Sequence, residues 1–576
     1  MNLNLNLIAL IFILISYVNS ERKLLEEKNK DDIIIIHTND VHCGILDNIG
    51  YDGLMLFKKE LQTKYENVLL VDDGDHIQGG AVSFLSRGSD IIKIMNELEY
   101  NVSTIGNHEF DYKLEQLYNL SKSLNNGYIN ANFCYRKNKK PIFDPYKIVE
   151  IGNKKIGFLG VLTPLTFNQT FLHTLIDNDG NYIYDFLTEK NGQELYDTIQ
   201  KYINELRNDK QVDYVIILSH LGFKGDQEEF SSEALLRNIE GVDAIIDGHS
   251  HQVYNKTSKD KTGKDIIITQ TGTKLSNVGL LTIRDGKIIS ELFSEIPLFE
   301  GYQNYDIDIR DGKNRYIDPD MNKFLRDIIK SHEKETEEVV GHTDFDMIAM
   351  DKKRIISRIQ ENNLCDLIAD SFKNYIHSDI CLLDSNNVQD NLKGDITYGD
   401  IINVLPFSNL LVEMKIPGQE ILDILEYGVK SLPNASGKFL QVSGIKFKVY
   451  DNIPSPVKVD DFDNYVKIEG ERRVFDVFVG NEKLDENKIY TLSLQDYMAN
   501  GGSGFTMFTK YNITNYTEGF ISEVFKMYIQ KDLKKKIPII YNTTQGRIVI
   551  MQKRNNSEYF KKYLGVYSIL LIFLLF

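Results

Sequence analysis

Short runs of apolar residues alternate with longer amphipathic segments over the first half of the chain. The runs lie at 33–36, 68–71, 156–161, 215–218 and 244–246. A run that is apolar at consecutive positions is typical of a strand buried on both faces, as in parallel sheets covered by helices. The pattern therefore predicts a largely parallel α/β domain over about 31–317.

The pattern changes near residue 318. Asp318-Pro319 is typical of a helix start, because aspartate caps the first free amide groups and proline fits the first turn. Apolar residues then follow at i, i+3, i+4 and i+7, which predicts a linker helix over 318–341. A second domain is expected over 342–551, with helices and strands of its own. Its predicted helices are 363–375 and 419–429, and its predicted strands are 446–449, 474–479 and 548–551.

The composition is that of a folded, anionic protein. The 576 residues include 66 Lys and Arg and 83 Asp and Glu, for a formal charge of −17, and 42% are hydrophobic. This composition excludes a disordered chain and a polytopic membrane protein. The negative charge argues against general binding of nucleic acids, which depends on neutralising phosphates. A small anionic substrate could still bind in a cleft made positive by metal ions.

Both ends of the chain are apolar, and we interpret them as processing signals. Residues 1–20 contain an apolar run followed by small residues, which indicates a cleaved signal peptide; a buried N-terminal helix is the alternative. The apolar residues 564–576 are fewer than the roughly 20 that a spanning helix needs. With small residues at 555–557, they fit a signal for addition of a lipid (GPI) anchor over 555–576, and a hydrophobic tail is the alternative. We therefore expect the secretory pathway and the extracellular face of the plasma membrane.

Glycosylation sequons agree with secretion, although an Asn-rich chain produces some of them by chance. They begin at Asn101, Asn119, Asn168, Asn255, Asn434, Asn512, Asn515, Asn542 and Asn555. The four cysteines are too few for a disulfide scaffold and lack the spacing of a zinc or redox site. Cys365 and Cys381 could form one bridge. Cys43 and Cys134 could pair or stay free.

Side chains that bind metals cluster where the apolar runs end. The loops in question are 37–42, 72–75, 106–111, 219–220 and 247–251. Because the carboxyl ends of parallel strands share one edge of a sheet, we expect these loops to form a single site. The candidate metal ligands are Asp40, His42, Asp75, Asn107, His220, His249 and His251.

This inventory suits two divalent ions, because a carboxylate can bridge two metals and imidazoles favour zinc or other transition metals. Asp75 is the best bridge. One predicted set is Asp40, His42, Asp75 and His251, and the other is Asp75, Asn107, His220 and His249. We expect zinc, with Mn, Co or Mg as alternatives. Such ions would give hydroxide from a bridging water at neutral pH and hold phosphoryl oxygens. The competing interpretation, helix caps and ordinary loop histidines, explains a single such residue better than the whole set.

His108 lies beside Asn107 and three residues before Asp111. At this spacing the carboxylate can orient the imidazole, which can then stabilise charge on phosphoryl oxygens or on the leaving group. We predict that His108 and Asp111 are catalytic. A structural His–Asp cap is the alternative, and His76 is expected to lie outside the ligand set.

These segments resemble the secreted and periplasmic 5′-nucleotidases of the calcineurin-like metallophosphoesterase superfamily. The matching stretches are 35–42, 73–75, 106–111, 219–222 and 248–251, and then 358–364, 404–407, 439–442 and 499–505. With its apolar tail, the chain looks like animal ecto-5′-nucleotidase. The resemblance implies an N-terminal four-layer α/β/β/α catalytic domain, a linker helix and a C-terminal α+β substrate domain that rotates on a hinge.

The resemblance also implies substrate-binding residues in the second domain. Phe407 matches an aromatic residue that stacks on the nucleobase, and Tyr497 stands where the family has Phe. Either ring can stack on a base. Arg358 matches an arginine that binds the substrate phosphate.

Three positions depart from the family. Asp384 replaces the usual Asn, Gln389 replaces a phosphate-binding Arg, and Ser503 replaces an Asp that holds the ribose hydroxyls. The first two changes remove positive character and a bidentate phosphate contact. They leave the metal ligands untouched, so hydrolysis should survive, while affinity and choice of nucleotide are open.

Taken together, the sequence predicts a cell-surface 5′-nucleotidase that hydrolyses nucleoside 5′-monophosphates such as AMP through a metal-activated hydroxide. An apyrase, a UDP-sugar hydrolase or a cyclic-nucleotide phosphodiesterase on the same framework is the alternative. The three departures also motivate a nucleotide-binding surface protein with weakened catalysis. The expected partners are a nucleotide and, through the C-terminal segment, a membrane, but no nucleic-acid polymer; a homodimer is left open.

Overall fold

The computed structural model describes residues 28–553, apart from 167–174, 176–181, 225–227, 299–301, 311, 352–354 and 461–462. The predicted signal peptide and anchor signal, and the sequons at Asn168 and Asn555, lie outside the described residues. The chain divides into two compact units, Met1–His332 (unit 1) and Glu333–Phe576 (unit 2). Among the residues described, no helix has both the length and the apolar character needed to cross a membrane.

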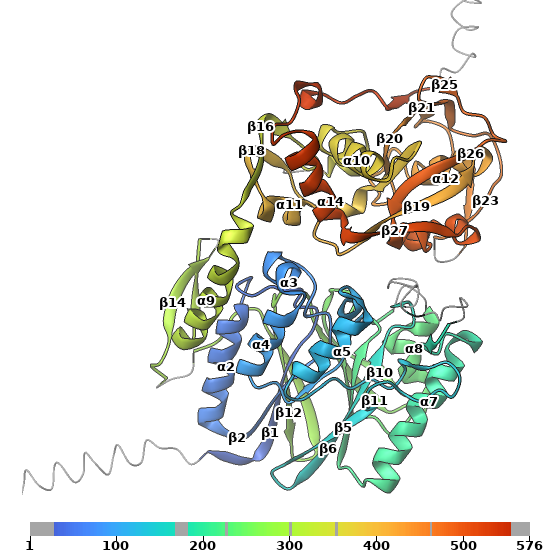
Figure 1. The fold of residues 1–576 in the computed structure, drawn as a ribbon. Coiled ribbons are helices and arrows are strands. Elements are labelled where there is room, and N and C mark those ends of the chain that lie inside the picture. The colour runs from blue at the N-terminus through green and yellow to red at the C-terminus, as the bar shows by residue number, and fades with distance from the viewer. Residues whose placement is uncertain are drawn as a thin grey trace, which may run out of the picture. The chain divides into compact units, whose positions relative to one another are not determined.

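The two large β-sheets of unit 1 share a hydrophobic core (Figure 1). The first sheet has the order β13 (Lys287–Phe293), β12 (Val278–Arg284), β1 (Asn29–Thr38), β2 (Tyr65–Asp72) and β3 (Val102–Ser103). The second has the order β10 (Val253–Lys259), β11 (Asp265–Thr271), β9 (Ala244–Asp247), β8 (Tyr214–His220), β6 (Lys154–Leu162) and β5 (Tyr146–Ile151). Strands β1, β2 and β3 of the first sheet pair in parallel, as do β11, β9, β8 and β6 of the second, which confirms the predicted, largely parallel arrangement. The remaining strands, β12, β13, β10 and β5, pair antiparallel.

The core between the two sheets explains the continuous apolar runs. Ile33 and Ile35 of β1 pack in one cluster with Phe158 of β6 and Ile216 of β8. Because successive side chains of a strand point to opposite faces, the other isoleucines of β1 face away from this core. They are buried as well, since helices cover the outer faces of the sheets.

The helices complete a four-layer α/β/β/α arrangement. In the first half of the unit, α2 (Gly50–Lys64) lies against β2, and α3 (Ala81–Ser86), α4 (Ser89–Glu97) and α5 (Lys113–Ser123) follow. On the second sheet, α7 (Gln193–Asn204) and α8 (Ser232–Asn238) pack their apolar faces over β6, β8 and β9. This architecture leaves the carboxyl ends of the parallel strands free to carry loops.

The linker helix begins where the sequence predicts and ends earlier. Oδ1 of Asp318 accepts a hydrogen bond from the backbone amide of Met321 at 2.9 Å, and α9 spans Pro319–Thr336. The predicted end at residue 341 is wrong, because Val339 begins strand β16 (Val339–Met347), which pairs with β18 (Leu392–Thr397). The β-branched pair at 339–340 favours that strand.

Unit 2 contains a five-stranded and a four-stranded sheet. The first has the order β20 (Leu440–Ser443), β17 (Ile380–Asp384), β26 (Ile489–Gln495), β19 (Leu410–Pro417) and β27 (Ile513–Phe520). The second has the order β25 (Glu482–Lys483), β24 (Val474–Val479), β21 (Ile445–Tyr450) and β28 (Ile548–Met551). The helices are α10 (Asn363–Ile376), α11 (Tyr398–Val404), α12 (Gly418–Gly428), α13 (Asp496–Ala499) and α14 (Ile521–Met527). All the helices and strands predicted here are present, to within two residues at each end.

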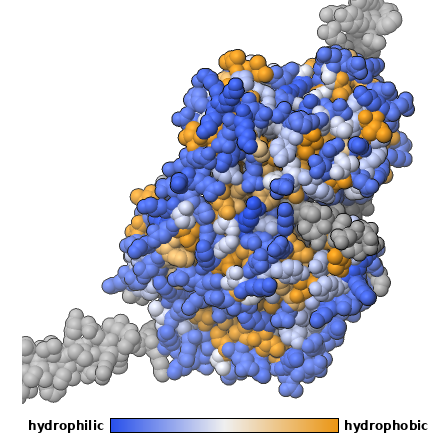
Figure 2. All heavy atoms as spheres, viewed as in Figure 1, coloured by the Kyte–Doolittle hydropathy of each residue, from blue (hydrophilic) through white to orange (hydrophobic). Residues whose placement is uncertain are grey.

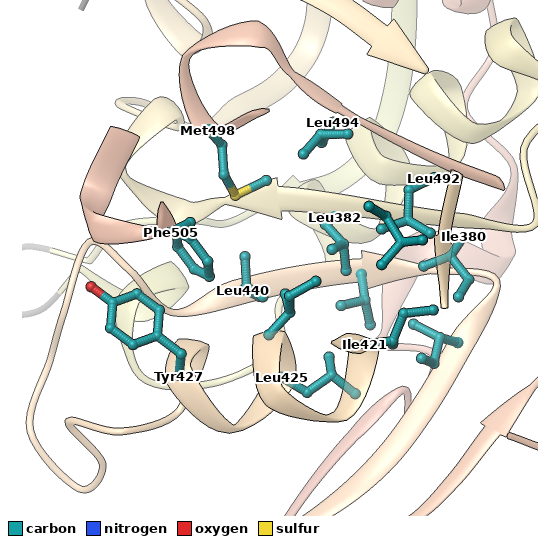
Figure 3. Close-up of a cluster of buried hydrophobic side chains, with 14 of the residues drawn as sticks. Ile380, Leu382, Ile421, Leu425, Tyr427, Leu440, Leu492, Leu494, Met498 and Phe505 are labelled. Carbon is teal, nitrogen blue, oxygen red and sulfur yellow. The ribbon is translucent and has the colours of Figure 1, made fainter. Parts of the chain in front are cut away.

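Helix α12 supplies much of the core of unit 2. Ile421 and Leu425 lie against Ile380 and Leu382 of β17, while Tyr427 extends the cluster toward the end of the helix (Figure 3). Ile421 and Leu425 are four residues apart, so they lie on the same face of the helix. The apolar periodicity of this segment therefore corresponds to its buried face.

The four cysteines are buried and free, so the bridge that Cys365 and Cys381 could have formed is absent from the described residues. Cys365 lies in the first turn of α10, whereas Cys381 lies near Asp370 and Lys373, more than a turn further along that helix. Both thiols are fully buried and belong to the core.

We expect Leu425→Ala to destabilise unit 2 by about 2–5 kcal/mol, because it removes a fully buried side chain and leaves a cavity. Leu422→Ala, on the same helix at a partly buried position, is the matched control and should cost less. Urea denaturation followed by circular dichroism measures both. Equal losses for the two variants would contradict the assigned buried face.

Candidate active site

Two groups of metal-binding side chains lie at the carboxyl ends of the unit 1 strands. One contains Asp40, His42 and His251, and the other contains Asp75, His220 and His249. Within each group, one ligand atom from every residue lies within 4.8 Å of the others. Asn107 joins the second group, where its Oδ1 lies 2.9 Å from Nδ1 of His249.

Aspartate side chains connect the two groups. Oδ2 of Asp75 lies 3.0 Å from Nε2 of His220 and 3.8 Å from Nε2 of His42. The carboxylate of Asp40 accepts a hydrogen bond from the backbone amide of His249 at 3.0 Å, and its Oδ1 lies 3.5 Å from Nε2 of His251. The structure thus brings all seven residues singled out in the sequence into one constellation.

The histidines direct ring nitrogens into this constellation. Nδ1 of His220 donates to the carbonyl oxygen of Asp73 at 2.6 Å, and Nδ1 of His42 donates to Oε1 of Gln78 at 2.9 Å. When the imidazole is neutral and Nδ1 carries the proton that makes this hydrogen bond, Nε2 has a free lone pair. Nε2 of His42 also lies 2.9 Å from Nε2 of His251. Lone pairs that converge with carboxylates suit bound cations, so the donor set fits two divalent ions.

Electrostatics favour the metal-binding form of three of these donors, whereas burial raises the pKa of Asp40 to about 8 and the Asp75 carboxylate, outweighing burial, raises the pKa of His220 well above its usual value. Burial lowers the pKa of His42 to about 3 and that of His251 to about 4, so both imidazoles are neutral. Burial alone raises the pKa of Asp75, but the neighbouring His220 and His108 outweigh it and hold that pKa well below its usual value. Asp75 is therefore a carboxylate.

The backbone at the site is strained. Five of the seven candidate ligands adopt the left-handed conformation, which costs roughly 1–2 kcal/mol for a residue with a side chain. They are Asp40 (φ 50°), His42 (φ 46°), Asp75 (φ 55°), His249 (φ 71°) and His251 (φ 53°). Strain concentrated at one place is typical of a functional site. Gly106 permits the close approach, since a Cβ there would lie 2.2 Å from Oδ1 of Asp75.

Glu109 fixes the loops that carry two of the candidate ligands. Its Oε2 accepts hydrogen bonds from the backbone amides of Asp75 at 2.8 Å and Gly106 at 2.5 Å, and its Oε1 accepts from the amide of His76 at 3.0 Å. Sequence reasoning gave this residue no role, although its place three residues after a loop glycine is a capping signal. Nothing in the sequence singles out Gln78, which orients His42.

His76 lies outside the ligand set, because both of its ring nitrogens are already bonded. Nδ1 lies 2.7 Å from Oδ1 of Asp72, and Nε2 lies 2.7 Å from the hydroxyl of Tyr128. Burial lowers the pKa of His76, but Glu109 and Asp72 outweigh that effect and raise the pKa to about 9. His76 therefore acts as a buried cation that holds the loop after β2.

His108 and Asp111 form a pair next to the constellation. Nδ1 of His108 lies 2.9 Å from Oδ2 of Asp111, and the backbone amide of His108 donates to Oδ1 of Asp75 at 2.8 Å. Burial lowers the pKa of His108, but Asp111 and Asp75 outweigh it and raise the pKa to about 10. The side chain of His108 is 26% exposed, whereas that of His220 is fully buried. A substrate could therefore reach this imidazole.

In unit 2, two of the departing residues are in contact. Oγ of Ser503 donates a hydrogen bond to Oδ2 of Asp384 at 2.5 Å. Asp384 ends β17 and is fully buried, and burial raises its pKa to about 6. Ser503 adopts a left-handed conformation (φ 53°) between two glycines.

Arg358 and Gln389 both bond to Asn386, in the turn after β17. A guanidinium nitrogen of Arg358 donates to Oδ1 of Asn386 at 2.9 Å, and Nε2 of Gln389 donates to its carbonyl oxygen at 2.5 Å. Four of the six predicted substrate residues thus surround this turn. Phe407 follows α11 and Tyr497 lies in α13, both partly exposed, and their joint stacking on a base stays a prediction.

Two family models match the chain. The calcineurin-like phosphoesterase model matches residues 33–253, and the model of the 5′-nucleotidase C-terminal domain matches 339–510. A snake venom 5′-nucleotidase from Crotalus adamanteus is 26% identical, over 90% of this chain and 88% of that protein. The human 5′-nucleotidase is also 26% identical, over 90% of each chain.

Solved structures give the same result. A 5′-nucleotidase precursor from Thermus thermophilus is 26% identical, with a TM-score of 0.61 over 91% of this chain and 100% of that one. A Staphylococcus aureus protein described as a putative 5′-nucleotidase reaches a TM-score of 0.69 over 91% of this chain and 100% of that one, at 16% identity. The similarity to the second structure supports the fold alone.

We expect Glu109→Gln to lower metal content and phosphatase activity by about 10–100-fold, the usual cost of losing an outer partner of a metal ligand. The amide can accept at only one atom, so it cannot hold all three backbone amides. Elemental analysis and release of phosphate measure the effect. Glu115→Gln, at an exposed position of α5, is the control. Wild-type metal content in Glu109→Gln would contradict the positioning role.

Proposed function

This chain belongs to the 5′-nucleotidase family of calcineurin-like phosphoesterases, and from that premise we propose that it hydrolyses nucleoside 5′-monophosphates such as AMP to nucleoside and phosphate. It is a metal-dependent phosphoester hydrolase. The observation that carries the proposal is the constellation of seven donors beside the His108–Asp111 pair. In the same chain, a second unit carries the predicted nucleotide residues.

The proposed ligands divide as the structure groups them. Asp40, His42 and His251 would hold one ion, Asp75, His220, His249 and Asn107 would hold the other, and Asp75 would serve both. Bound divalent ions supply Lewis-acid stabilisation of phosphoryl oxygens and lower the pKa of water. We propose zinc, because imidazole nitrogens make up four of the seven donors.

His108 is proposed to act on the phosphoryl group or on the leaving oxygen. Asp111 holds Nδ1 and keeps the imidazole protonated, so Nε2 can donate a hydrogen bond to a developing negative charge. Hydrolysis forms a bond between a water oxygen and phosphorus and breaks the bond between phosphorus and the 5′ oxygen. The 5′ oxygen gains a proton that originates from the water. A protonated His108 is suited to stabilise this leaving group.

Unit 2 is proposed to select the nucleotide. Phe407 and Tyr497 would stack on the base, and Arg358 would contact the phosphate. Gln389 cannot make the fork-shaped phosphate contact of an arginine, and Asp384 adds a carboxylate. Binding should therefore depend more on the metal ions than in relatives that have the arginine. We also propose secretion, glycosylation and attachment to the extracellular face of the plasma membrane through residues 555–576.

The purified full chain, supplied with Zn²⁺ or Mn²⁺, should release phosphate from AMP in preference to ADP, ATP, UDP-glucose and 2′,3′-cyclic AMP. Asp75→Asn should lower this activity by at least about 100-fold, more than is typical for the loss of an outer partner of a metal ligand. Asp197→Asn, on the exposed side of α7, is the control. A chelator should abolish release, and added metal should restore it.

Three outcomes would count against the proposal. Preference for ADP or ATP would make the protein an apyrase, and preference for UDP-glucose or the cyclic nucleotide would assign the corresponding alternative. Absence of metal-dependent release from every substrate would favour a nucleotide-binding protein.

Gln389→Arg should lower KM for AMP by about tenfold, because a charged, bidentate donor is added beside Arg358. Gln389→Lys is the matched control and should have a smaller effect, since an ammonium group cannot form the fork. Steady-state kinetics test both variants, and kcat should change little. An unchanged KM in both would place residue 389 away from the substrate phosphate.

A further inference from the structure

A hollow in unit 2 is lined by three basic residues. Its volume is about 430 Å³, and residues of α10, β20 and β21 form much of its lining. The charged residues of the lining are Lys373, Lys446, Arg547 and Asp370, which together carry a net charge of +2 in a chain of net charge −17. On the face of unit 2 seen in Figure 2, hydrophobic residues form small patches among hydrophilic ones. A positive hollow in an anionic protein suits an anion better than an apolar partner.

The hollow lies apart from the residues that the sequence predicts to bind the nucleotide. In the register of β17 and β20, Asp384 pairs with Leu440, whereas Ser443 of the lining pairs with Cys381. Three residues of a strand span roughly 10 Å. The lining contains none of the candidate metal ligands and none of the predicted substrate residues. The hollow is therefore a separate candidate site within unit 2.

A glycine makes room for one of the lysines. Gly444 has a φ of 75°, a conformation in which a residue with a side chain is strained. A Cβ at this position would lie 2.6 Å from Cε of Lys373 and 2.1 Å from the carbonyl oxygen of Asp379. Because no side chain fits there, the aliphatic part of Lys373 lies directly against the glycine. The backbone thus fixes where Lys373 enters the lining.

Arg547 and Asp370 form a neutral pair in the lining. One guanidinium nitrogen of Arg547 donates to Oδ2 of Asp370 at 2.7 Å, and the other donates to the carbonyl oxygen of Val442 at 2.7 Å. Oδ1 of Asp370 accepts from the hydroxyl of Ser443 at 2.5 Å. The carboxylate is therefore already satisfied by its neighbours, and it offsets one of the three positive charges.

The charges of the two lysines have no such offset. Within the described part of the chain, Nζ of neither Lys373 nor Lys446 forms an ion pair or a hydrogen bond, and Nζ of Lys446 lies 5.4 Å from the centre of the Phe478 ring. Asp366 is the other carboxyl group beside Arg547, and burial raises its pKa to about 8 although Arg547 opposes this shift. Asp366 is thus mostly neutral at pH 7. Two positive charges remain for a ligand.

The size and the lining of the hollow favour an organic phosphate. A phosphate monoester carries a charge of about −1.5 to −2 at neutral pH, which matches two lysines, and lysine binds phosphate as a point charge. The volume of about 430 Å³ falls within the range of roughly 300–1,000 Å³ that is typical of pockets for small organic ligands. The amide of Asn374 and the hydroxyl of Tyr528 also line the hollow and can bond to hydroxyl groups.

We propose that this hollow binds a small organic phosphate, of the kind formed by a sugar and a single phosphate group. Lys373 and Lys446 contact the phosphate oxygens, and Asn374 and Tyr528 contact the organic part. The site is separate from the candidate active site, so the inference does not depend on the proposed reaction.

Isothermal titration calorimetry with glucose 6-phosphate tests the site. The full chain is produced by secretion and purified in detergent, so that it carries any glycan on Asn542, which lies three residues before Gln545 of the lining. Asp75→Asn is included to suppress turnover. In this background, Lys373→Gln combined with Lys446→Gln should raise Kd by at least about tenfold, because two charged contacts are lost.

A second pair of lysines supplies the matched control. Lys323→Gln combined with Lys330→Gln, at exposed positions of α9, changes the net charge equally and should leave Kd unchanged. Lys446→Arg keeps the charge and should stay within about threefold of the parent. Thermal unfolding, and release of phosphate from AMP by the same lysine variants with Asp75 intact, should match the parent and show that the fold is kept.

Four outcomes would overturn the proposal. Equal Kd values for the two double variants would place binding elsewhere, and the absence of measurable binding at millimolar glucose 6-phosphate would remove the site. Tighter binding of succinate would assign a dicarboxylate, and equally tight binding of inorganic phosphate would show that the organic part is not recognised. Binding that appears only after enzymatic removal of glycans would also exclude the site in the secreted protein.

Discussion

The buried carboxylate of Asp75 is the constraint on which the catalytic unit depends. An anion that is fully desolvated needs nearby donors or opposite charge, or it becomes protonated. Here Oδ1 accepts the backbone amide of His108, and Oδ2 lies beside Nε2 of His220. The left-handed backbone of Asp75 brings the side chain into this position, and Glu109 holds the backbone. The residues around Asp75 therefore hold its carboxylate in position before any substrate binds.

The same constraint accounts for the choice of fold. Donors that come from residues far apart in the chain can converge only if their loops start from one rigid edge. Parallel strands of two packed sheets provide that edge, because β1, β2, β8 and β9 all end on it. The strands place the loops, and glycines such as Gly106 let them approach. The packing of the two sheets is therefore needed to bring the candidate metal ligands together.

Much of this arrangement could be predicted from the sequence, because runs such as 33–36 record burial on both faces and the ligand types record the chemistry. What could not be predicted depends on partners distant in the chain. Val339 leaves the linker helix because it can pair with Thr397, 58 residues later. Glu109 matters through amides of residues 75 and 76, and the separation of Cys365 from Cys381 follows from how α10 lies on β17. Local pattern contains little information on such contacts.

The departures in unit 2 are physically coupled, which changes how they should be weighed. Ser503 donates to Asp384, so a carboxylate at 384 and a hydroxyl at 503 satisfy each other. A lone change to either residue would leave a polar group near a buried charge without its partner. Asp384 and Ser503 can therefore both belong to a working site. Compared with the family pattern, the carboxylate then lies at position 384 instead of position 503. Loss of the guanidinium at 389 has no such compensation in the contacts of Gln389, which bonds only to backbone in the described structure. We therefore expect these departures to change phosphate affinity more than sugar contact.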